Sequence, residues 1–413
     1  MKERLVAGAS FEVSSTVNLK GKLSESNRDG KEFKTSAIWA SANSRYRERI
    51  LDVSGSAEVA LSARRYVTAG LEKETGEIKQ RIALRPGAER VLIQRTNQQS
   101  TIFSPDAPLK GAELDLLQAD AFTPELNGLL PAKPVKKSDR WQASPIAASE
   151  LTGISPIQQG ALICTLIEVK STSVASVARI QISGSLTGPS DQGPTRMTVD
   201  GHFLFDLDTQ VISYVHLNGR TEILDEAGKV VGQLEGRYEL HRRPAIDDPR
   251  LSESALTGIV RKPNAQNTAL LFEASDQGIR FLYPRNWELT SVARIVVQLE
   301  EPTGGSMRLT IDADPAPTTS KLRSDLLSWL NSQQATVKDA SPVQSISLSN
   351  SRKADRFTVR AELGTKEKEW TYVVLRSNAR SVTVAANLVG DRADALRADI
   401  QSVASSLEFL AKP

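Results

Sequence analysis

The chain has 413 residues, of which 39% are hydrophobic and 24% are charged, a composition typical of packed domains rather than of disordered protein. Its 52 basic and 49 acidic residues leave a formal net charge of +3, too small to indicate the concentrated basic face of a nucleic-acid binder. We therefore expect two or three domains of roughly 100–200 residues each, and no nucleic-acid partner.

Cysteine content and apolar runs narrow the class further. Cys164 is the only cysteine, so neither an intramolecular disulfide nor a cysteine-based zinc site can form within the chain. Its apolar neighbours in ALICTLIEV indicate a buried thiol rather than a nucleophile. No apolar run approaches the ~18–20 residues of a transmembrane helix, so we expect no transmembrane segment.

The first residues bear on location. The start, MKERLVAGASFEV, lacks the apolar centre of a signal peptide, and an alternating strand pattern begins by Phe11. Two alternatives stay open: a cytoplasmic protein, or an exported one whose numbering begins at a processed or re-engineered N-terminus. The short leader before the first strand slightly favours the second.

The N-terminal block predicts an antiparallel meander. Apolar residues alternate over 11–23, as in a half-buried strand. Asp29 and Gly30 are residue types that tolerate the positive φ of a tight turn. Two further strands are expected over 33–41 and 45–53, and shorter pieces continue the meander.

A similar block returns downstream at a constant offset. Apolar residues and glycines recur in the same order: Val17 with Ile180, Leu19 with Ile182, Gly21 with Gly184, Leu23 with Leu186, Gly30 with Gly193. This pattern favours a duplicated strand–glycine–strand–turn–strand unit, with repeat units over 9–100 and 155–243. The alternative is two independent meanders whose turns both require glycine.

The segment between the blocks, 101–154, combines helical and irregular patterns. A helix is expected over 111–122, with Leu114 and Leu117 on one face and Asp120 capping the following turn. Prolines after it exclude a long regular element, and they stand at Pro131, Pro134 and Pro145. We interpret this segment as a buried crossover connection, with a ligand-gating loop as the alternative.

Alternation resumes strongly in the second block and ends near Arg243, which completes a β-rich region over 1–243. This region predicts curved sheets or a half-barrel. Residues 244–268 contain three prolines and little periodicity, so we expect an interdomain linker there, or an irregular crossing strap.

The last part, 269–413, predicts the order β-β-β-β-α-β-β-β-β-α. Pro284 cannot donate a ladder hydrogen bond and ends the strand GIRFLY, and Trp287 can cover the end of the core. A helix over 320–337 is expected, with Ser320 as its cap and an apolar face of Leu322, Leu326, Leu327 and Leu330. The final helix, over 392–409, has a predicted buried stripe of Ala395, Ile400, Val403 and Leu407. The fold class is thus α+β with predominantly antiparallel β structure.

Two stretches resemble known groups. The opening GIRFLYPRNWEL, the strand EWTYVVL and the final helix resemble the Mog1/PsbP-like α/β/α sandwich family, over about residues 270–411. The resemblance implies an antiparallel sheet covered by helices, used in adaptor, assembly and accessory roles, and it supplies no catalytic residues. The LLP-x-x-P-V-x-x-x-D-x-W stretch from Leu129 to Trp141 is similar to uncharacterised exported bacterial proteins, which implies export to the periplasm or beyond.

Side chains able to carry out chemistry are sparse. His202 and His216 fall on consecutive predicted strands, close enough in a hairpin to form a metal site with Asp206 or Asp208. Because the aspartates belong to the turn itself, we interpret both imidazoles, like His241, as ordinary strand histidines. The remaining carboxylate pairs adjoin turns and nominate no site: Asp247 with Asp248, Glu300 with Glu301, and Asp312 with Asp314.

Motifs of catalysis and phosphate binding are also missing. No G-x-S-x-G elbow occurs, and Ser10, Ser54 and Ser155 resemble ordinary turn and strand serines. GPSDQG lacks the Lys-Ser/Thr of a P-loop. The densest basic patch is interpreted as a solvated face and consists of Arg45, Arg47, Arg49, Arg64 and Arg65. We assign no catalytic, cofactor-binding or metal-binding residue and expect no cofactor.

These observations favour a non-enzymatic exported envelope protein with a binding, scaffolding or assembly role, although they do not decide whether it is an enzyme. Its partner would be another envelope protein or an apolar ligand. One alternative is a lipid or hydrophobic-ligand carrier that uses the N-terminal curved sheet, which requires an apolar concavity. Another is a hydrolase with an unrecognised site, which requires converging His, Asp or Ser side chains in a polar cleft. A scaffold requires only an exposed sheet edge or apolar patch.

Overall fold

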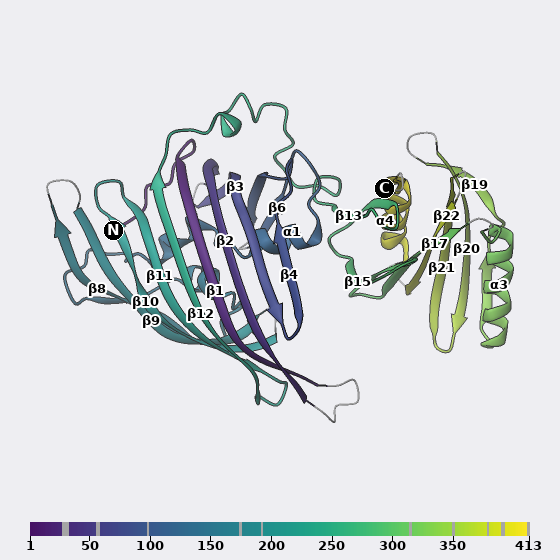
Figure 1. The fold of residues 1–413 in the computed structure, drawn as a ribbon, viewed down its shortest axis with the longest axis horizontal. Helices are drawn as coiled ribbons and strands as arrows, with labels where there is room; N and C mark the ends of the chain where they lie inside the picture. The colour runs from purple at the N-terminus through teal and green to yellow at the C-terminus, as the bar shows by residue number, and fades with distance from the viewer. Residues whose placement is uncertain are drawn as a thin grey trace. The chain divides into compact units, whose positions relative to one another are not determined.

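The computed structural model describes residues 1–26, 33–54, 58–96, 99–172, 176–190, 193–313, 316–348, 352–377, 380–389 and 393–410. The chain forms two compact units (Figure 1). The first comprises residues 1–107 and 112–263, and the second comprises residues 108–111 and 264–413.

One large antiparallel sheet forms most of the first unit. Its order is β6-β5-β3-β2-β1-β12-β11-β10-β9-β8-β7, and β4 pairs with β3. The bounds are β1 (Ser10–Ser26), β2 (Phe33–Val53), β3 (Val59–Thr75), β4 (Ile78–Ala83), β5 (Arg90–Thr96), β6 (Gln99–Phe103), β7 (Arg140–Gln142), β8 (Gln159–Ser171), β9 (Ser176–Ser190), β10 (Gly193–Asp206), β11 (Val211–Leu224) and β12 (Val230–Pro244). The sheet is open, and the two predicted meanders join in it where β1 pairs with β12.

The duplication itself stays a prediction, and the turn at Asp29 and Gly30 lies outside the described residues. The aligned glycines Gly21 and Gly184 do share an environment. A Cβ at either position would fall 2.0 or 2.1 Å from a carbonyl oxygen of the neighbouring strand.

The connection between β6 and β7 crosses the whole sheet, because these strands lie at its opposite ends. It contains α1 (Gly111–Gln118) and the 3₁₀ helix η1 (Thr123–Leu129), and α2 (Pro145–Thr152) lies in the next connection, between β7 and β8. Leu114, Leu117 and Leu126 are buried, as a crossover packed on the sheet requires. Helix α2 was not predicted: Pro145 occupies its first turn, where no hydrogen bond is lost, and the Ser144 side chain accepts from Ala147 N as its cap.

The two faces of this sheet differ in chemistry. Along β9, Ala178, Ile180 and Ile182 are buried, whereas the alternate residues Arg179 and Gln181 are exposed. The same period of two holds on the neighbouring strands. The apolar face is the inner face, on which the crossover packs, and the polar face is the outer face.

A row of glycines crosses the centre of the sheet. Six neighbouring strands contribute Gly21, Gly236, Gly219, Gly201, Gly184 and Gly160, each opposite or within two residues of a glycine on the next strand. A Cβ on Gly201 would lie 2.0 Å from the carbonyl oxygen of His216, and one on Gly160 would lie 1.9 Å from that of Ser185. Only glycine tolerates such close approach of neighbouring backbones, so this row lets the strands of the open sheet bend (Figure 1).

Residues 244–263 belong to the first unit. They form a strap that packs on this unit. Leu251 and Leu256 are buried against Ala63, Leu92 and Phe103 on the outer face of β3, β5 and β6. The few apolar residues of this segment are thus sufficient to anchor it. Residues 264–268 belong to the second unit.

The second unit contains two antiparallel sheets, ordered β13-β14-β23 and β15-β16-β17-β22-β21-β20-β18, with β19 on β20. The bounds are β13 (Leu270–Ala274), β14 (Ile279–Tyr283), β15 (Glu288–Ala293), β16 (Val296–Glu301), β17 (Gly305–Ala313), α3 (Thr319–Ser332), β18 (Thr336–Ala340), β19 (Gln344–Ser347), β20 (Lys353–Leu363), β21 (Lys366–Arg376), β22 (Arg380–Val389), α4 (Ala393–Ser406) and β23 (Glu408–Phe409). Strands β15 and β18 were not predicted, because they are exposed end strands without an alternating apolar pattern.

Local features of the second unit follow the prediction with two corrections. Strand β14 ends at Tyr283, directly before Pro284, and Trp287 is buried with its Nε1 donating to Asp399. The cap of α3 is Thr318 rather than Ser320. The stripe of α4 contains Leu396 in place of Ala395, which is exposed.

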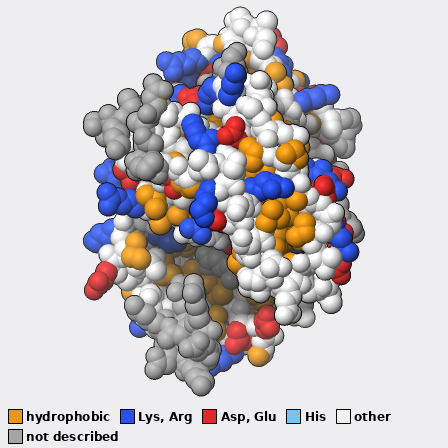
Figure 2. All heavy atoms as spheres, turned by 90° about the vertical axis from the view of Figure 1, so that its right-hand side faces the viewer, with side chains coloured by type: hydrophobic (Ala, Val, Ile, Leu, Met, Phe, Trp, Pro, Cys, Tyr) orange, Lys and Arg blue, Asp and Glu red, His pale blue; other side chains and the backbone are white. Residues whose placement is uncertain are grey.

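The surface of the second unit near α3 mixes charges with isolated hydrophobic side chains. Figure 2 views the molecule from the side on which α3 lies in Figure 1, and hydrophobic atoms are interspersed there with Lys, Arg, Asp and Glu. Trp329 of α3 and Val337 of β18 are 44% and 41% exposed. Isolated exposed apolar residues are ordinary on a protein surface and define no site.

Gly201→Ala tests the curvature argument. Its methyl group would collide with the backbone of β11, so we expect a loss of about 1–3 kcal/mol in the free energy of unfolding. Gly70→Ala is the matched control, because a Cβ there meets only an oxygen 3.7 Å away. Scanning calorimetry of the full chain would measure both variants, and equal effects would contradict the role of the glycine row.

Candidate functional site

A cavity of about 370 Å³ lies between the inner face and the ends of α1 and α2. Its floor is apolar and comes from three central strands and β10, with Val17, Leu19, Leu217, Leu234 and Met197. Its roof comes from the crossover, with Ala119 and Ala121, and from α2, with Leu151. A volume of several hundred Å³ with an apolar lining is typical of small-molecule sites.

The glycine row also keeps the floor of this cavity open. Gly219 and Gly236 are direct cross-strand partners, and both line the cavity. A Cβ on Gly219 would lie 2.6 Å from Met197 Cε, and one on Gly236 would lie 2.7 Å from Leu19 Cδ2. Side chains at these positions would therefore compete with the apolar floor for space.

Polar side chains occupy the remaining wall of the cavity. They are Gln118, Glu150, Thr152, Ser190, Thr195, Thr221 and Tyr238. The hydroxyl oxygen of Tyr238 is buried and has no hydrogen-bond partner in the described part of the chain. Burial, with the nearby carboxylates of Asp120 and Glu150, raises the pKa of Tyr238 above its ordinary value, so the phenol is protonated.

A buried ion pair fixes the crossover above the sheet. Arg64 Nε donates to Glu48 Oε1 at 2.8 Å, and both side chains are fully buried on the inner face. The same pair reaches the crossover, since Thr123 donates to Glu48 and Arg64 Nη2 donates to the carbonyl oxygen of Ala121. Burial alone would raise the pKa of Glu48, but Arg64, Arg242 and the Thr123 hydroxyl outweigh it and hold that pKa low.

A second buried contact joins the crossover to the central strands. Asp120 accepts hydrogen bonds from the hydroxyl groups of Ser15 and Ser44, each at 2.7 Å. Asp120 therefore binds the sheet and does not cap the following turn; the N-cap position of η1 is Phe122. Nearby, Glu150 accepts from Phe122 N at 2.5 Å.

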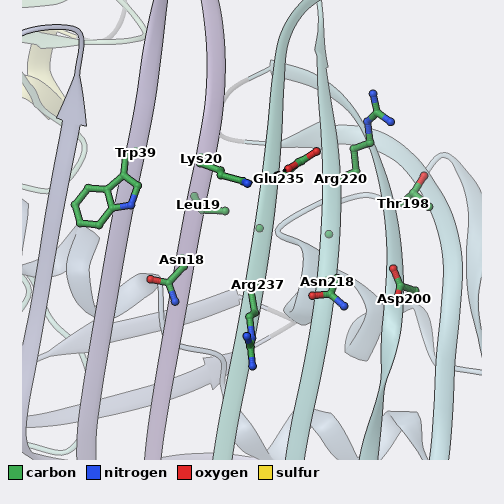
Figure 3. A pocket seen from close by; sticks show the side chains of 12 residues that line it. Asn18, Leu19, Lys20, Trp39, Thr198, Asp200, Asn218, Arg220, Glu235 and Arg237 are labelled. Carbon is green, nitrogen blue, oxygen red and sulfur yellow. Dashed lines mark ion pairs between the residues drawn. The ribbon is translucent and has the colours of Figure 1, made fainter.

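The outer face has a groove of about 680 Å³ above the glycine row (Figure 3). Trp39 is 40% exposed there, and the Lys20 and Glu235 side chains of neighbouring strands form an ion pair at 3.6 Å. The other polar side chains of the groove are Asn18, Thr198, Asp200, Asn218, Arg220 and Arg237. This groove offers an aromatic surface and mixed charges, without the apolar lining of the inner cavity.

All three histidines lie on the outer face, in one row with a tyrosine. His202 and His216 are direct cross-strand partners with ring centroids 5.6 Å apart, which confirms that they are neighbours. Tyr214 lies 4.7 Å from His241 by the same measure. Burial, Arg179 and the neighbouring His216 lower the pKa of His202.

The histidine row does not form a metal or catalytic centre. Asp206 accepts from the backbone of its own turn, and Asp208 accepts from Ser176 N. His216 Nδ1 approaches Glu239 at 3.3 Å, and no histidine is hydrogen-bonded to a serine hydroxyl in the ranges that the structure covers. Among the described residues, no group of three or more His, Cys, Asp or Glu side chains is placed to hold a metal ion.

The basic patch separates into two parts, because alternate residues of a strand face opposite sides. Arg64 is buried on the inner face, which corrects its interpretation as part of a solvated surface. The other four arginines face outward and form ion pairs: Arg45 and Arg47 with Glu12, Arg49 with Asp247, Arg65 with Asp248. Asp247 also accepts from Ser10, so Asp247 and Asp248 hold the strap.

The remaining candidates have structural surroundings. Cys164 is fully buried, and burial raises the pKa of its thiol to about 12, as expected for a thiol that packs as a hydrophobe. Glu300 and Glu301 bind Gln298 and Thr303 within their own hairpin. Asp312 belongs to β17, and Asp314 lies outside the described residues.

Comparison with known proteins gives no family. No family model and no curated protein matches the sequence. Among solved structures, the chain is similar to PsbP (CyanoP) from Synechocystis, which has a Mog1/PsbP-like fold, with 17% identity over 38% of this chain and 99% of that one and a TM-score of 0.28. A structure of lipid–protein interactions in lipovitellin shares 9% identity, over 59% of this chain and 26% of that chain, with a TM-score of 0.33. DynF from the dynemicin biosynthesis pathway of Micromonospora chersina shares 7% identity over 61% of this chain and 86% of that one, with a TM-score of 0.16.

These similarities are too low to assign a fold or a function to this chain. The chain spans about a quarter of the lipovitellin chain. Within the described ranges, no helix is both long enough and apolar enough to cross a membrane.

Arg64→Met tests the buried anchor. It leaves the Glu48 carboxylate buried without its partner, so we expect a loss of about 3–5 kcal/mol in the free energy of unfolding. The double variant Glu48→Gln/Arg64→Met removes the stranded charge and should recover part of that loss. Lys20→Met is the control on the outer face, where breaking the exposed Lys20–Glu235 pair costs about 1 kcal/mol or less. Urea titration of the full chain would measure all three, and equal losses in the two single variants would contradict the assignment.

Acid titration tests the cluster around Glu12. Hydrogen bonds from Arg243 and Arg45, with the nearby charge of Arg47, lower the pKa of Glu12 to about 2. A lowered folded-state pKa gives stability that is present above the unfolded value of about 4.5 and is lost as the pH falls toward 2. Since solvent screens the exposed arginines, we expect a contribution of up to about 1 kcal/mol. Glu12→Gln should lower stability at pH 7 and flatten this dependence between pH 4.5 and 2; an unchanged profile would contradict it.

Proposed function

We propose that the protein is a non-enzymatic binding protein that carries an apolar or amphiphilic ligand in the cavity of its first unit. The observation that supports this most directly is the cavity of about 370 Å³, whose floor of Val, Leu and Met side chains lies on the inner face of a curved sheet. A ligand that covers these apolar side chains removes their surface from water, and this favours binding.

The alternative of a hydrolase has less support. Its histidines would have to converge with an acid and a nucleophile, and all three lie on the outer face instead. The inner cavity is lined by hydroxyls, one amide and the Glu150 carboxylate beside its apolar floor, and by no histidine. That lining suits the binding of an amphiphile more than general acid–base chemistry.

We also propose export to the cell envelope and an assembly role for the second unit. The stretch that suggests export is structurally compact, because Trp141 Nε1 donates to the carbonyl oxygen of Leu129 at 2.8 Å and so joins its two ends. The β-rich order with two helices supports a Mog1/PsbP-like second unit. Cell fractionation of the source organism tests the location, and recovery in the cytoplasm alone would exclude it.

Ala119→Trp tests the carrier function. Ala119 is an exposed residue at the mouth of the cavity, so a large side chain there fills the cavity without straining the core. We expect at least a tenfold loss of affinity for N-phenyl-1-naphthylamine, a neutral apolar fluorescent probe, measured with delipidated full-length protein. Ala227→Trp, in the exposed β11–β12 turn, is the matched control and should bind as the unmodified protein does.

Native mass spectrometry of protein from its own host completes this test. An extra mass that disappears on organic extraction supports a carrier, and its loss in Ala119→Trp but not in Ala227→Trp locates the ligand. Failure of the unmodified delipidated protein to bind the probe would refute the carrier function.

A further inference from the structure

The unpartnered hydroxyl of Tyr238 identifies the class of ligand more closely. Tyr238 lies on β12 between Val17 of β1 and Leu217 of β11, its direct cross-strand partners. Both partners belong to the apolar floor of the cavity. The phenol thus places a hydroxyl between two apolar side chains of the floor.

A buried hydroxyl without a hydrogen bond is costly, by about 1–3 kcal/mol. Buried polar atoms in native proteins nearly always have a partner, and exceptions call for a functional explanation. The carboxylates near Tyr238 are already engaged. Asp120 accepts from Ser15 and Ser44, and Glu150 accepts from Phe122 N and lies 3.3 Å from Arg95. The Tyr238 hydroxyl is therefore a donor that no acceptor in the described residues satisfies.

The same carboxylates select the charge of a ligand. Asp120, Arg64 and Glu150 all act on Tyr238 electrostatically, and the Arg64 cation is outweighed by the two carboxylates, so a ligand oxygen bound to the hydroxyl would lie in a net negative field. A carboxylate or phosphate at that point would meet like charges in a poorly solvated site, which is unfavourable. A neutral acceptor oxygen avoids this repulsion.

Resting on the carrier function proposed above, we propose that Tyr238 donates a hydrogen bond to the neutral ester or alcohol oxygen of a long-chain ligand. The chain of the ligand covers the apolar floor, and its oxygen completes the hydrogen bonding of the phenol. The substrate class is then neutral acyl esters and long-chain alcohols, in preference to free fatty acids.

Displacement of N-phenyl-1-naphthylamine by methyl dodecanoate and by dodecanoate at pH 8 tests this specificity. The unmodified protein should bind the ester more tightly than the carboxylate. In Tyr238→Phe, which removes only the hydroxyl, the ester should bind about five- to tenfold more weakly, as expected for the loss of one hydrogen bond. Affinity for the probe, which does not depend on this bond, should change less than twofold.

Tyr214→Phe on the outer face is the matched control and should leave every affinity unchanged. An ester affinity that survives Tyr238→Phe, or tighter binding of dodecanoate than of the ester, would overturn the assignment while leaving the carrier function standing. Absence of probe binding in the unmodified protein would refute both.

Discussion

The curvature of the large sheet is the constraint on which the first unit depends. A flat sheet of this width would expose its apolar face, and a crossover of some thirty-five residues (104–139) could not cover it. Bending at Gly21, Gly184 and Gly201 brings the strands around the crossover instead, because no Cβ blocks the close approach of neighbouring backbones. The same absence of side chains at Gly219 and Gly236 leaves space above the floor. Curvature and cavity thus have one cause in the sequence.

Buried polar contacts determine where the crossover lies within that curve. Apolar packing alone would let the crossover shift along the sheet. Glu48 Oε2 and Arg64 Nη2, in contrast, are hydrogen-bonded to specific atoms of the crossover, and a shift would break these buried bonds. Asp120 adds the same requirement on the central strands. The desolvation of these groups reduces their net contribution to stability, so their effect is mainly to fix one arrangement. A cavity between the crossover and the sheet keeps a defined shape only if both of its walls are fixed in this way.

Most of the elements that could be predicted were recognised from the alternation of apolar and polar residues along the strands and from turn-forming residues. These signals located the strands of both units, the end of β14 before Pro284 and the neighbouring His202 and His216. Elements without such a signal were missed: the exposed strands β15 and β18, and helix α2, whose Pro145 begins a helix as readily as it ends one. Arg64 was misread because it was grouped by proximity in sequence; the period of two separates it from Arg65. The six glycines of the row are visible in the sequence, but their meaning depends on the register of the strands, which the sequence does not reveal.

The candidate site was less predictable than the fold, because it arises from residues distant in sequence. Val17, Ala119 and Tyr238 meet only once the two meanders join at β1 and β12 and the crossover packs on them. The outer groove is larger, at about 680 Å³, but its charges are mixed and include the Lys20–Glu235 pair, so it gives less driving force for an apolar molecule. On the inner face the apolar floor supplies that force, and the unpartnered hydroxyl of Tyr238 supplies direction. Arg242 Nε and Nη2 are also buried without partners, but Arg242 is not among the residues that line the cavity, whereas Tyr238 is. The Tyr238 hydroxyl is therefore the unpartnered donor that a ligand in the cavity is placed to satisfy.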